Sequence, residues 1–187
     1  MANGLGLEGA YEDAMRRIQE QSENQSKLAM EALMWISRSK RPLRVDELCN
    51  ALAVKIGSTH LTLDNVPSIR TILACCLGLV AVDKEASTVR LIHFTLHMYL
   101  RGHSTLFPSP DGTIAEVCLT YLNLQSTKDP SPASSDTANP ALLEYASHYW
   151  GTHARAETCR VYWPARGSLL WKYGDFNSAT EDQIVGY

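Results

Sequence analysis

The stretch LRVDELCNALAVKIGSTHLTLDNVPSIRTILACCLGLVAVDKEASTVRLIHFTLHMYLR, residues 43–101, decides the fold of this chain. Apolar residues recur at helical spacing from Val45 onward, after which Gly57 interrupts the pattern. A second helical run covers 65–77, with an asparagine in the capping position, and Gly78 ends it. The first half of the stretch therefore predicts a helix, a turn and a second helix.

Two short runs rich in β-branched residues follow, at 79–83 and 88–92, and a charged turn separates them. Their length and composition predict an antiparallel hairpin of two strands. A further helix is predicted to begin near His93, directly after the second strand. A helix-turn-helix followed by a two-stranded hairpin is the winged-helix plan, so the predicted fold is mainly α with one small wing.

Helices are also predicted on both sides of the winged helix. The expected parts are N-terminal linking helices at 7–38, a winged-helix domain at 39–103, a loop and post-wing helix at 104–124, a flexible linker at 125–139, and a C-terminal helical segment with a tail at 140–187. Within these parts, an apolar surface on several sides predicts a buried helix at 25–38. The loop is placed up to Gly112, and the last helix is placed at 140–151 with proline in its first position.

Composition places the chain among ordinary globular proteins. It has 187 residues, a hydrophobic content of 45% and a net charge of −3, so nothing general draws it to nucleic acid or to an anionic membrane. The five cysteines form no C-x-x-C pair, and we expect reduced, buried thiols in a cytoplasmic protein. The sequence contains neither a signal-peptide pattern nor a run of about 18 apolar residues, so no membrane association is expected.

The tetrapeptide Arg38-Ser39-Lys40-Arg41 forms a basic patch just before Pro42, where the second linking helix should end. Cations suit the negative end of a helix dipole, so we interpret this patch as a solvated helix end. A contact with phosphate or nucleic acid is the alternative interpretation.

Several short motifs, in order, carry a resemblance to a known family. They are Met34-Trp35-Ile36, Arg41-Pro42-Leu43, LCNALA at 48–53, VRLIHFTL at 89–96, Tyr99-Leu100 and LLEYASHYW at 142–150. Together they resemble the winged-helix domain that follows the NACHT nucleotide-binding module in fungal STAND-type NTPases. Those proteins are relatives of the NOD-like receptors and often continue into ankyrin or WD repeats. This winged helix commonly takes its name from GPI inositol-deacylase.

The resemblance implies a regulatory and interaction module without catalytic activity. It would pack on the nucleotide-binding module, hold the inactive state and transmit nucleotide-dependent rearrangement. A P-loop requires a glycine followed by lysine, and none of the eleven glycines here is. The resemblance therefore places the NACHT module in cis, outside this chain, which is then a fragment, a truncated product or a degenerate relative.

His93 is the candidate nucleotide-sensing residue that the resemblance implies. In the related receptors a Met-His-Asp motif stands where the wing passes into the next helix, and its histidine contacts the β-phosphate of ADP. Here the sequence is Ile92-His93-Phe94, which keeps the histidine and lacks the aspartate. An imidazole at a helix start, beside unpaired backbone amides, can favour an anion. The alternative is a histidine hydrogen-bonded to the backbone for structure alone.

Other site chemistries find little support in the sequence. His93 and His97 have the spacing of H-E-x-x-H metal sites but lack the glutamate between them, and no G-x-S-x-G nucleophile motif occurs. We therefore expect no catalytic residue, no metal and no cofactor.

A DNA-binding transcription regulator is the competing function, because many winged helices bind DNA. The stretch 43–101 carries six Lys or Arg against five Asp or Glu, and the expected recognition helix has Arg70 as its one basic residue. DNA binding needs a concentrated basic face, so this balance argues against it.

Overall fold

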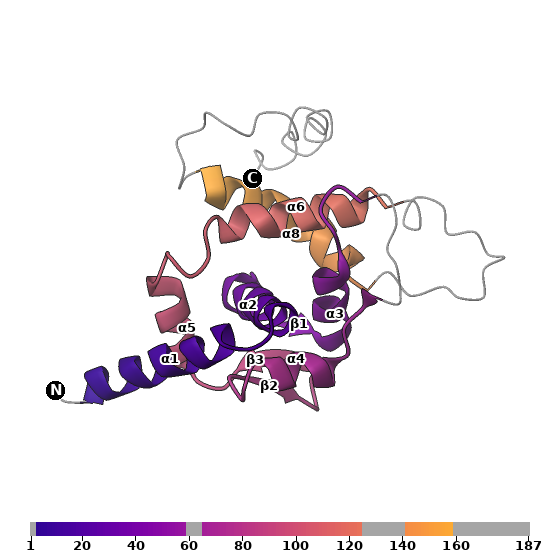
Figure 1. Ribbon diagram of the computed structural model, residues 1–187. Coiled ribbons are helices and arrows are strands. Elements are labelled where there is room, and N and C mark those ends of the chain that lie inside the picture. Colours follow the sequence, from indigo (N-terminus) through magenta and orange to yellow (C-terminus); the bar gives the residue numbers. More distant parts are fainter. Residues whose placement is uncertain (1–2, 59–64, 125–140, 159–187) are drawn as a thin grey trace.

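The computed structural model describes residues 3–58, 65–124 and 141–158. Within these ranges the order of elements is α1 (Asn3–Gln19), α2 (Glu23–Arg38), β1 (Leu43–Arg44), α3 (Val45–Ala53), α4 (Ile69–Cys75), β2 (Val80–Asp83), β3 (Thr88–Leu91), α5 (Phe94–Gly102), α6 (Pro110–Leu122) and α8 (Leu143–Thr158). The described chain is mainly helical with one small antiparallel sheet, which confirms the predicted winged-helix class (Figure 1).

The sheet has the strand order β1-β3-β2, and both pairs are antiparallel. The wing predicted at 79–83 and 88–92 is confirmed, since β2 and β3 pair from Val80 opposite Leu91 to Asp83 opposite Thr88. The third strand was not predicted. β1 is two residues long, too short to show a strand pattern, and it pairs through Leu43 opposite Val89 only because the fold brings it beside β3.

Helix α2 lies at the centre of the fold (Figure 1), in contact with α1, α3, α4, α5, α6 and β3. Its burial on several sides was predicted and is confirmed: Ala29, Ala32 and Leu33 have no exposed surface, and Trp35 is 2% exposed. Fully burying a large apolar side chain stabilises a fold by about 1.5–3 kcal/mol. The core of the winged helix is thus built around α2, a helix that precedes it in the sequence.

Helix α4 begins later than predicted. It starts at Ile69, and the Oγ of Ser68 caps it by accepting a hydrogen bond from the Thr71 N–H at 3.1 Å. The predicted start at Asn65 was wrong because Pro67 disfavours helical backbone in the residue before it.

Helix α6 begins earlier than predicted, at Pro110 instead of Thr113, so Gly112 lies inside a helix and not in the loop. Proline suits the first helical position because its missing N–H would have no partner there. The prediction gave Gly112 too much weight as a helix breaker.

Helix α8 covers Leu143–Thr158, so the predicted span of 140–151 was wrong at both ends. The helix continues through Gly151, although glycine costs about 1 kcal/mol relative to alanine in a helix interior. Extensive packing along α6 outweighs that cost, and it buries His153 completely. The predicted linker at 125–139 and the part of the predicted C-terminal segment and tail from 159 onward lie outside the described residues.

The four described cysteines, at 49, 75, 76 and 118, are buried and free, as predicted, while Cys159 lies outside the described residues. Burial raises the pKa of both Cys76 and Cys118 to about 12, so these thiols stay protonated and unreactive. No helix in the described ranges has the length and apolar character needed to cross a bilayer.

Candidate functional site

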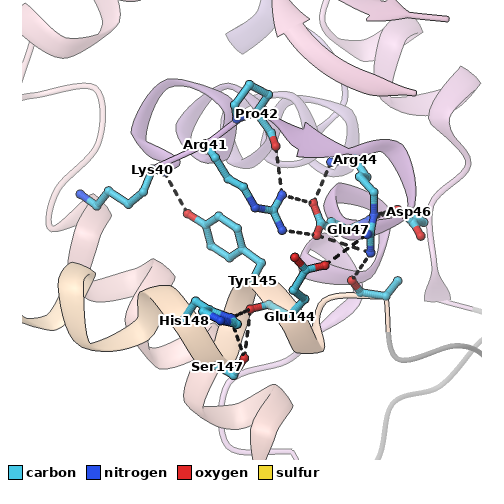
Figure 2. Close-up of polar contacts among 11 residues, drawn as sticks. Lys40, Arg41, Pro42, Arg44, Asp46, Glu47, Glu144, Tyr145, Ser147 and His148 are labelled. Carbon is cyan, nitrogen blue, oxygen red and sulfur yellow. Dashed lines mark hydrogen bonds and ion pairs between the residues drawn. The ribbon is translucent and has the colours of Figure 1, made fainter. Parts of the chain in front are cut away.

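The segment between α2 and α3, residues 39–44, carries most of the ion pairs of the winged helix. Helix α2 ends at Arg38, and the Ser39 hydroxyl donates to the Trp35 carbonyl at 2.6 Å. Pro42 then prevents the helix from continuing. The chain turns here, and Figure 2 shows Lys40, Arg41 and Arg44 of this segment near Tyr145 and Glu144 of α8. We call residues 39–44 the junction.

Within the junction, Arg41 binds Glu47 through two parallel hydrogen bonds of 2.6 and 2.8 Å (Figure 2). The Arg44 N–H also donates to Glu47 at 2.8 Å, which ties the first turn of α3 to the chain before it. Glu47 has no exposed surface. Burial by itself raises the pKa of Glu47, but the hydrogen bonds from Arg41 and Arg44 outweigh that effect and lower it. Glu47 is therefore a buried carboxylate that stays ionised.

A second network closes into a ring of four residues, Lys40, Tyr145, His153 and Asp111, which we call the polar ring. The Lys40 N–H donates to the Tyr145 hydroxyl at 3.2 Å, and that hydroxyl lies 2.8 Å from His153 Nε2. His153 Nδ1 lies 2.6 Å from Asp111 Oδ1, and Lys40 Nζ donates to the same oxygen at 3.0 Å. Lys40 of the junction thus bonds to Asp111 and to Tyr145, the two ends of the hydrogen-bonded series Asp111–His153–Tyr145.

The protonation states of the polar ring follow from its donors and acceptors. An ionised carboxylate only accepts, so Nδ1 of His153 carries the proton that points at Asp111. The Tyr145 hydroxyl accepts from the Lys40 N–H and shares a hydrogen bond of 2.8 Å with Nε2 of His153. Burial by itself raises the pKa of Asp111, yet the hydrogen bonds from His153 and Lys40 outweigh it and lower the pKa to about 2. Burial raises the pKa of Tyr145 to about 12. Every member is satisfied at neutral pH.

Carboxylate, imidazole and hydroxyl stand here in the order of a catalytic relay, but the ring has no access for a substrate. Tyr145 and His153 have no exposed surface. A nucleophile or general base must come within hydrogen-bond distance of the atom on which it acts. The polar ring therefore holds helices together. Arg41 adds to this by lying over the Tyr145 ring, with its guanidinium carbon 5.3 Å from the ring centroid.

The interpretation of the basic tetrapeptide as a solvated helix end was wrong. Arg38 is only 6% exposed, and the side chains of Lys40 and Arg41, each 26% exposed, pair with Asp111 and Glu47. A glutamate three residues after Arg44 was a sequence signal for the Glu47 contact, because that spacing is typical of a capping box. Nothing local in the sequence pointed to Asp111, which is 71 residues away from Lys40.

His93, the candidate nucleotide-sensing residue, is not a member of the polar ring. It is the N-cap residue of α5, its side chain is exposed, and that side chain makes no capping hydrogen bond. Its exposure and the missing capping bond argue against the alternative in which His93 is a structural hydrogen-bonding residue.

Beside His93, helix α5 displays large apolar side chains. Phe94 is 76% exposed and Met98 is 57% exposed, one helical turn apart. The half-buried ring of His97 stacks on Phe94 with a centroid distance of 6.0 Å. Burial lowers the pKa of His97, and the positive charges of Arg101 and Arg38 lower it further. We call His93, Phe94, His97 and Met98 the α5 face.

The two helices with broad apolar surfaces, α2 and α8, meet in the core of this chain. Trp35 packs edge-on against Tyr145 with a centroid distance of 5.9 Å. The apolar surfaces of these two helices therefore face each other inside this chain.

Comparison with known proteins gives one match. The family described as "GPI inositol-deacylase, winged helix domain" matches residues 16–118, a range that contains α2 to α5 and most of α6. No match was found among curated proteins or among solved structures. The matched range is more than half of the chain and contains the junction, the wing and His93, so this chain belongs to the family of the GPI inositol-deacylase winged helix domain.

Proposed function

We propose that this chain is a non-catalytic regulatory module of a NACHT-type STAND signalling NTPase in the cytoplasm. In this proposal the α5 face packs on the nucleotide-binding module of the same polypeptide and holds it in the inactive state. The observation that carries the proposal is the exposure of Phe94 and Met98 directly beside His93. Large apolar side chains grouped on one helix face mark interaction sites more often than isolated ones do.

The charges around the α5 face favour a partner with an apolar pocket and an anionic rim. Helix α5 contains no acidic residue, and Arg101 lies exposed in its last turn. His93 stands at the helix N-terminus, where the first backbone N–H groups have no partner within the helix. A phosphate group bound by the partner would suit this end of α5.

The position of α1 also supports an upstream partner. The Tyr11 hydroxyl lies 2.7 Å from the Thr95 hydroxyl, so α1 runs beside α5, and the first turns of α1 extend away from the rest of the fold (Figure 1). A module joined to the N-terminal end of α1 would therefore lie near the α5 face. A linker through α1 raises the effective concentration of such a module at this face.

In this proposal, regulation comes from a contact that forms in one nucleotide state of the partner module and not in the other. If the α5 face contacts the nucleotide-binding module only in its ADP-bound form, each contact shifts the population toward the inactive state. Nucleotide exchange removes the contact and frees the module for assembly. We propose that His93 senses the phosphate and that Phe94 and Met98 supply the affinity for the nucleotide-binding module.

The test uses a receptor that contains both the nucleotide-binding module and this chain. His93→Ala should speed the release of a fluorescent ADP analogue about tenfold, which corresponds to losing one charge-assisted hydrogen bond. Phe94→Asp combined with Met98→Asp should weaken docking of the two separately purified pieces. Lys84→Ala, in the exposed wing turn, is the control and should change neither quantity. Unchanged ADP release and docking in both test variants contradicts the proposal.

An electrophoretic mobility-shift assay with duplex DNA at low salt tests the competing function, that of a DNA-binding transcription regulator. Helix α4 has seven residues, with Arg70 as its basic side chain, and the wing turn carries Asp83 and Glu85. Retardation that depends on Arg70 would favour the DNA-binding alternative over the proposal.

A further inference from the structure

Helices α6 and α8 form a unit of their own within the described fold. They pack along each other more extensively than any other pair of elements (Figure 1). Glu157, near the end of α8, also closes the start of α6: it accepts a hydrogen bond from the Ser109 hydroxyl at 2.7 Å and one from the Gly112 N–H at 3.1 Å. We call α6 and α8 the helix pair.

Three of the four members of the polar ring lie inside the helix pair. Asp111 comes from α6, and Tyr145 and His153 come from α8, so the Asp111–His153–Tyr145 chain would stay intact if the pair moved as one body. Lys40 is the member that comes from the winged helix. Its backbone N–H and its Nζ bond to the two ends of that chain.

Further polar contacts across this boundary join neutral groups or lie near water. The Gly57 N–H donates to the hydroxyl of the buried Thr120 at 3.2 Å, and both groups are neutral. Arg44 reaches the Ala141 carbonyl at 3.2 Å and Glu144 at 3.3 Å, and the side chains of Arg44 and Glu144 are 41% and 61% exposed. By contrast, the fully buried Glu47 has its ion-pair partner Arg41 on the winged-helix side of the boundary. Separation along this boundary would not remove Arg41 from Glu47.

We propose that the helix pair is a releasable unit, held on the winged helix by Lys40, and that it undocks from the winged helix as one body. On release, Asp111 keeps the hydrogen bond from His153, and the ammonium of Lys40 returns to water. Neither member of this ion pair is then left buried and unpaired, which is the usual cause of a high cost when a buried ion pair is broken. Opening either unit internally would instead separate Arg41 from Glu47 or Asp111 from His153. The boundary at Lys40 is therefore where the helix pair separates from the winged helix before either ion pair inside the two units opens. This inference concerns a different surface from the α5 face and does not depend on it.

Hydrogen–deuterium exchange of the full chain, resolved by peptide, tests the proposal. Lys40→Met keeps the backbone N–H and the aliphatic stem but removes the bond to Asp111. Exchange of the amides in α6 and α8 should accelerate about tenfold, while α2, α3 and the wing keep their rates. Lys84→Met is the matched control, since Lys84 is exposed in the wing turn, and it should leave all rates unchanged.

Tyr145→Phe is the second variant, and it keeps the ring packed on Trp35 while removing the hydroxyl shared by Lys40 and His153. It should show the same acceleration confined to α6 and α8. Equal acceleration in α2 and α3 would show that the chain opens as one cooperative body and would overturn the proposal. Unchanged exchange of the helix pair in both variants would overturn it as well.

Discussion

Lys40 Nζ and Asp111 Oδ1 lie 3.0 Å apart, although 71 positions separate the two residues in the sequence. The contact joins the end of α2 to the first turn of α6, and it is part of a ring that continues through His153 and Tyr145. Because Asp111 is buried and the Lys40 side chain is 26% exposed, this ion pair is screened less by solvent than a fully exposed pair would be. The contribution of this ion pair to the free energy of unfolding can be measured separately from that of the neighbouring ion pair between Arg41 and Glu47.

Loss of Arg41 should destabilise the fold strongly. Arg41→Ala leaves Glu47 buried with no exposed surface and without its two-bond partner, so we expect the free energy of unfolding to fall by about 3 kcal/mol. Arg16→Ala removes a guanidinium that pairs with Asp13 and Glu20 at the exposed surface, and it should leave the urea midpoint nearly unchanged, because solvent screens such pairs. Urea denaturation of both variants measures the difference. Equal losses would mean that Glu47 finds other donors.

Asp111 should make the free energy of unfolding depend on pH in the acid range. Its pKa in the folded state, about 2, lies below the ordinary value of 3.8, so ionised Asp111 stabilises the fold above about pH 4, and this contribution disappears as the pH falls toward 2. The difference in unfolding free energy between wild type and Asp111→Asn should therefore shrink by roughly 2 kcal/mol between pH 7 and pH 2. Denaturation curves at several pH values test this. A pH-independent difference would show that the carboxylate charge is not what holds the ring.

His93→Ala should leave the isolated chain as stable as wild type, within about 0.5 kcal/mol, because the ring is exposed and does not cap α5. Thermal denaturation followed by circular dichroism measures this. A loss of about 1–3 kcal/mol would restore the structural interpretation of His93, since such a loss is typical of a buried hydrogen-bonding group. The stability of this variant is thus the control for its effect on ADP release.

Two glycines in helices should respond to alanine with opposite signs. At Gly112 a Cβ would lie 2.6 Å from the Ser109 Oγ and 3.1 Å from the Glu157 Cγ, so Gly112→Ala should break the contact between those two side chains and destabilise by about 1 kcal/mol. At Gly151 a Cβ would meet no atom within 4 Å, so Gly151→Ala should stabilise α8 by up to about 1 kcal/mol. Melting temperatures of the two variants decide the matter, and a stabilised Gly112→Ala would contradict the proposed closure of α6 by Glu157.

The wing and the helices of the winged helix could be predicted from sequence because their signals are local. A charged turn between two β-branched runs predicts a hairpin without reference to the rest of the chain, and β2 and β3 lie where those runs are. Boundaries were less predictable. Gly112 and Gly151 both lie inside helices, because packing between α6 and α8 outweighs a local preference of about 1 kcal/mol.

The candidate sites divide in the same way. His93 could be placed at a strand-to-helix junction from its sequence context, and the structure puts it at the N-cap of α5. The polar ring could not be foreseen, since Asp111 and His153 carry no local pattern and meet only when α6 and α8 pair. The exposure of Phe94 and Met98 was equally hidden, because an apolar residue in an amphipathic helix is normally expected to face the core.

The sequence by itself determined the mainly helical class, the two-stranded wing and the burial of α2 on several sides, because periodicity and turn chemistry act over a few residues. Only the tertiary structure decided that β1 joins the sheet, that the basic junction is paired instead of solvated, and that Lys40 closes a ring with Asp111, His153 and Tyr145. The physical reason is how far apart in the sequence the interacting residues lie. A buried charge is stable only beside its partner, and that partner can come from any part of the chain that the fold brings within about 3 Å.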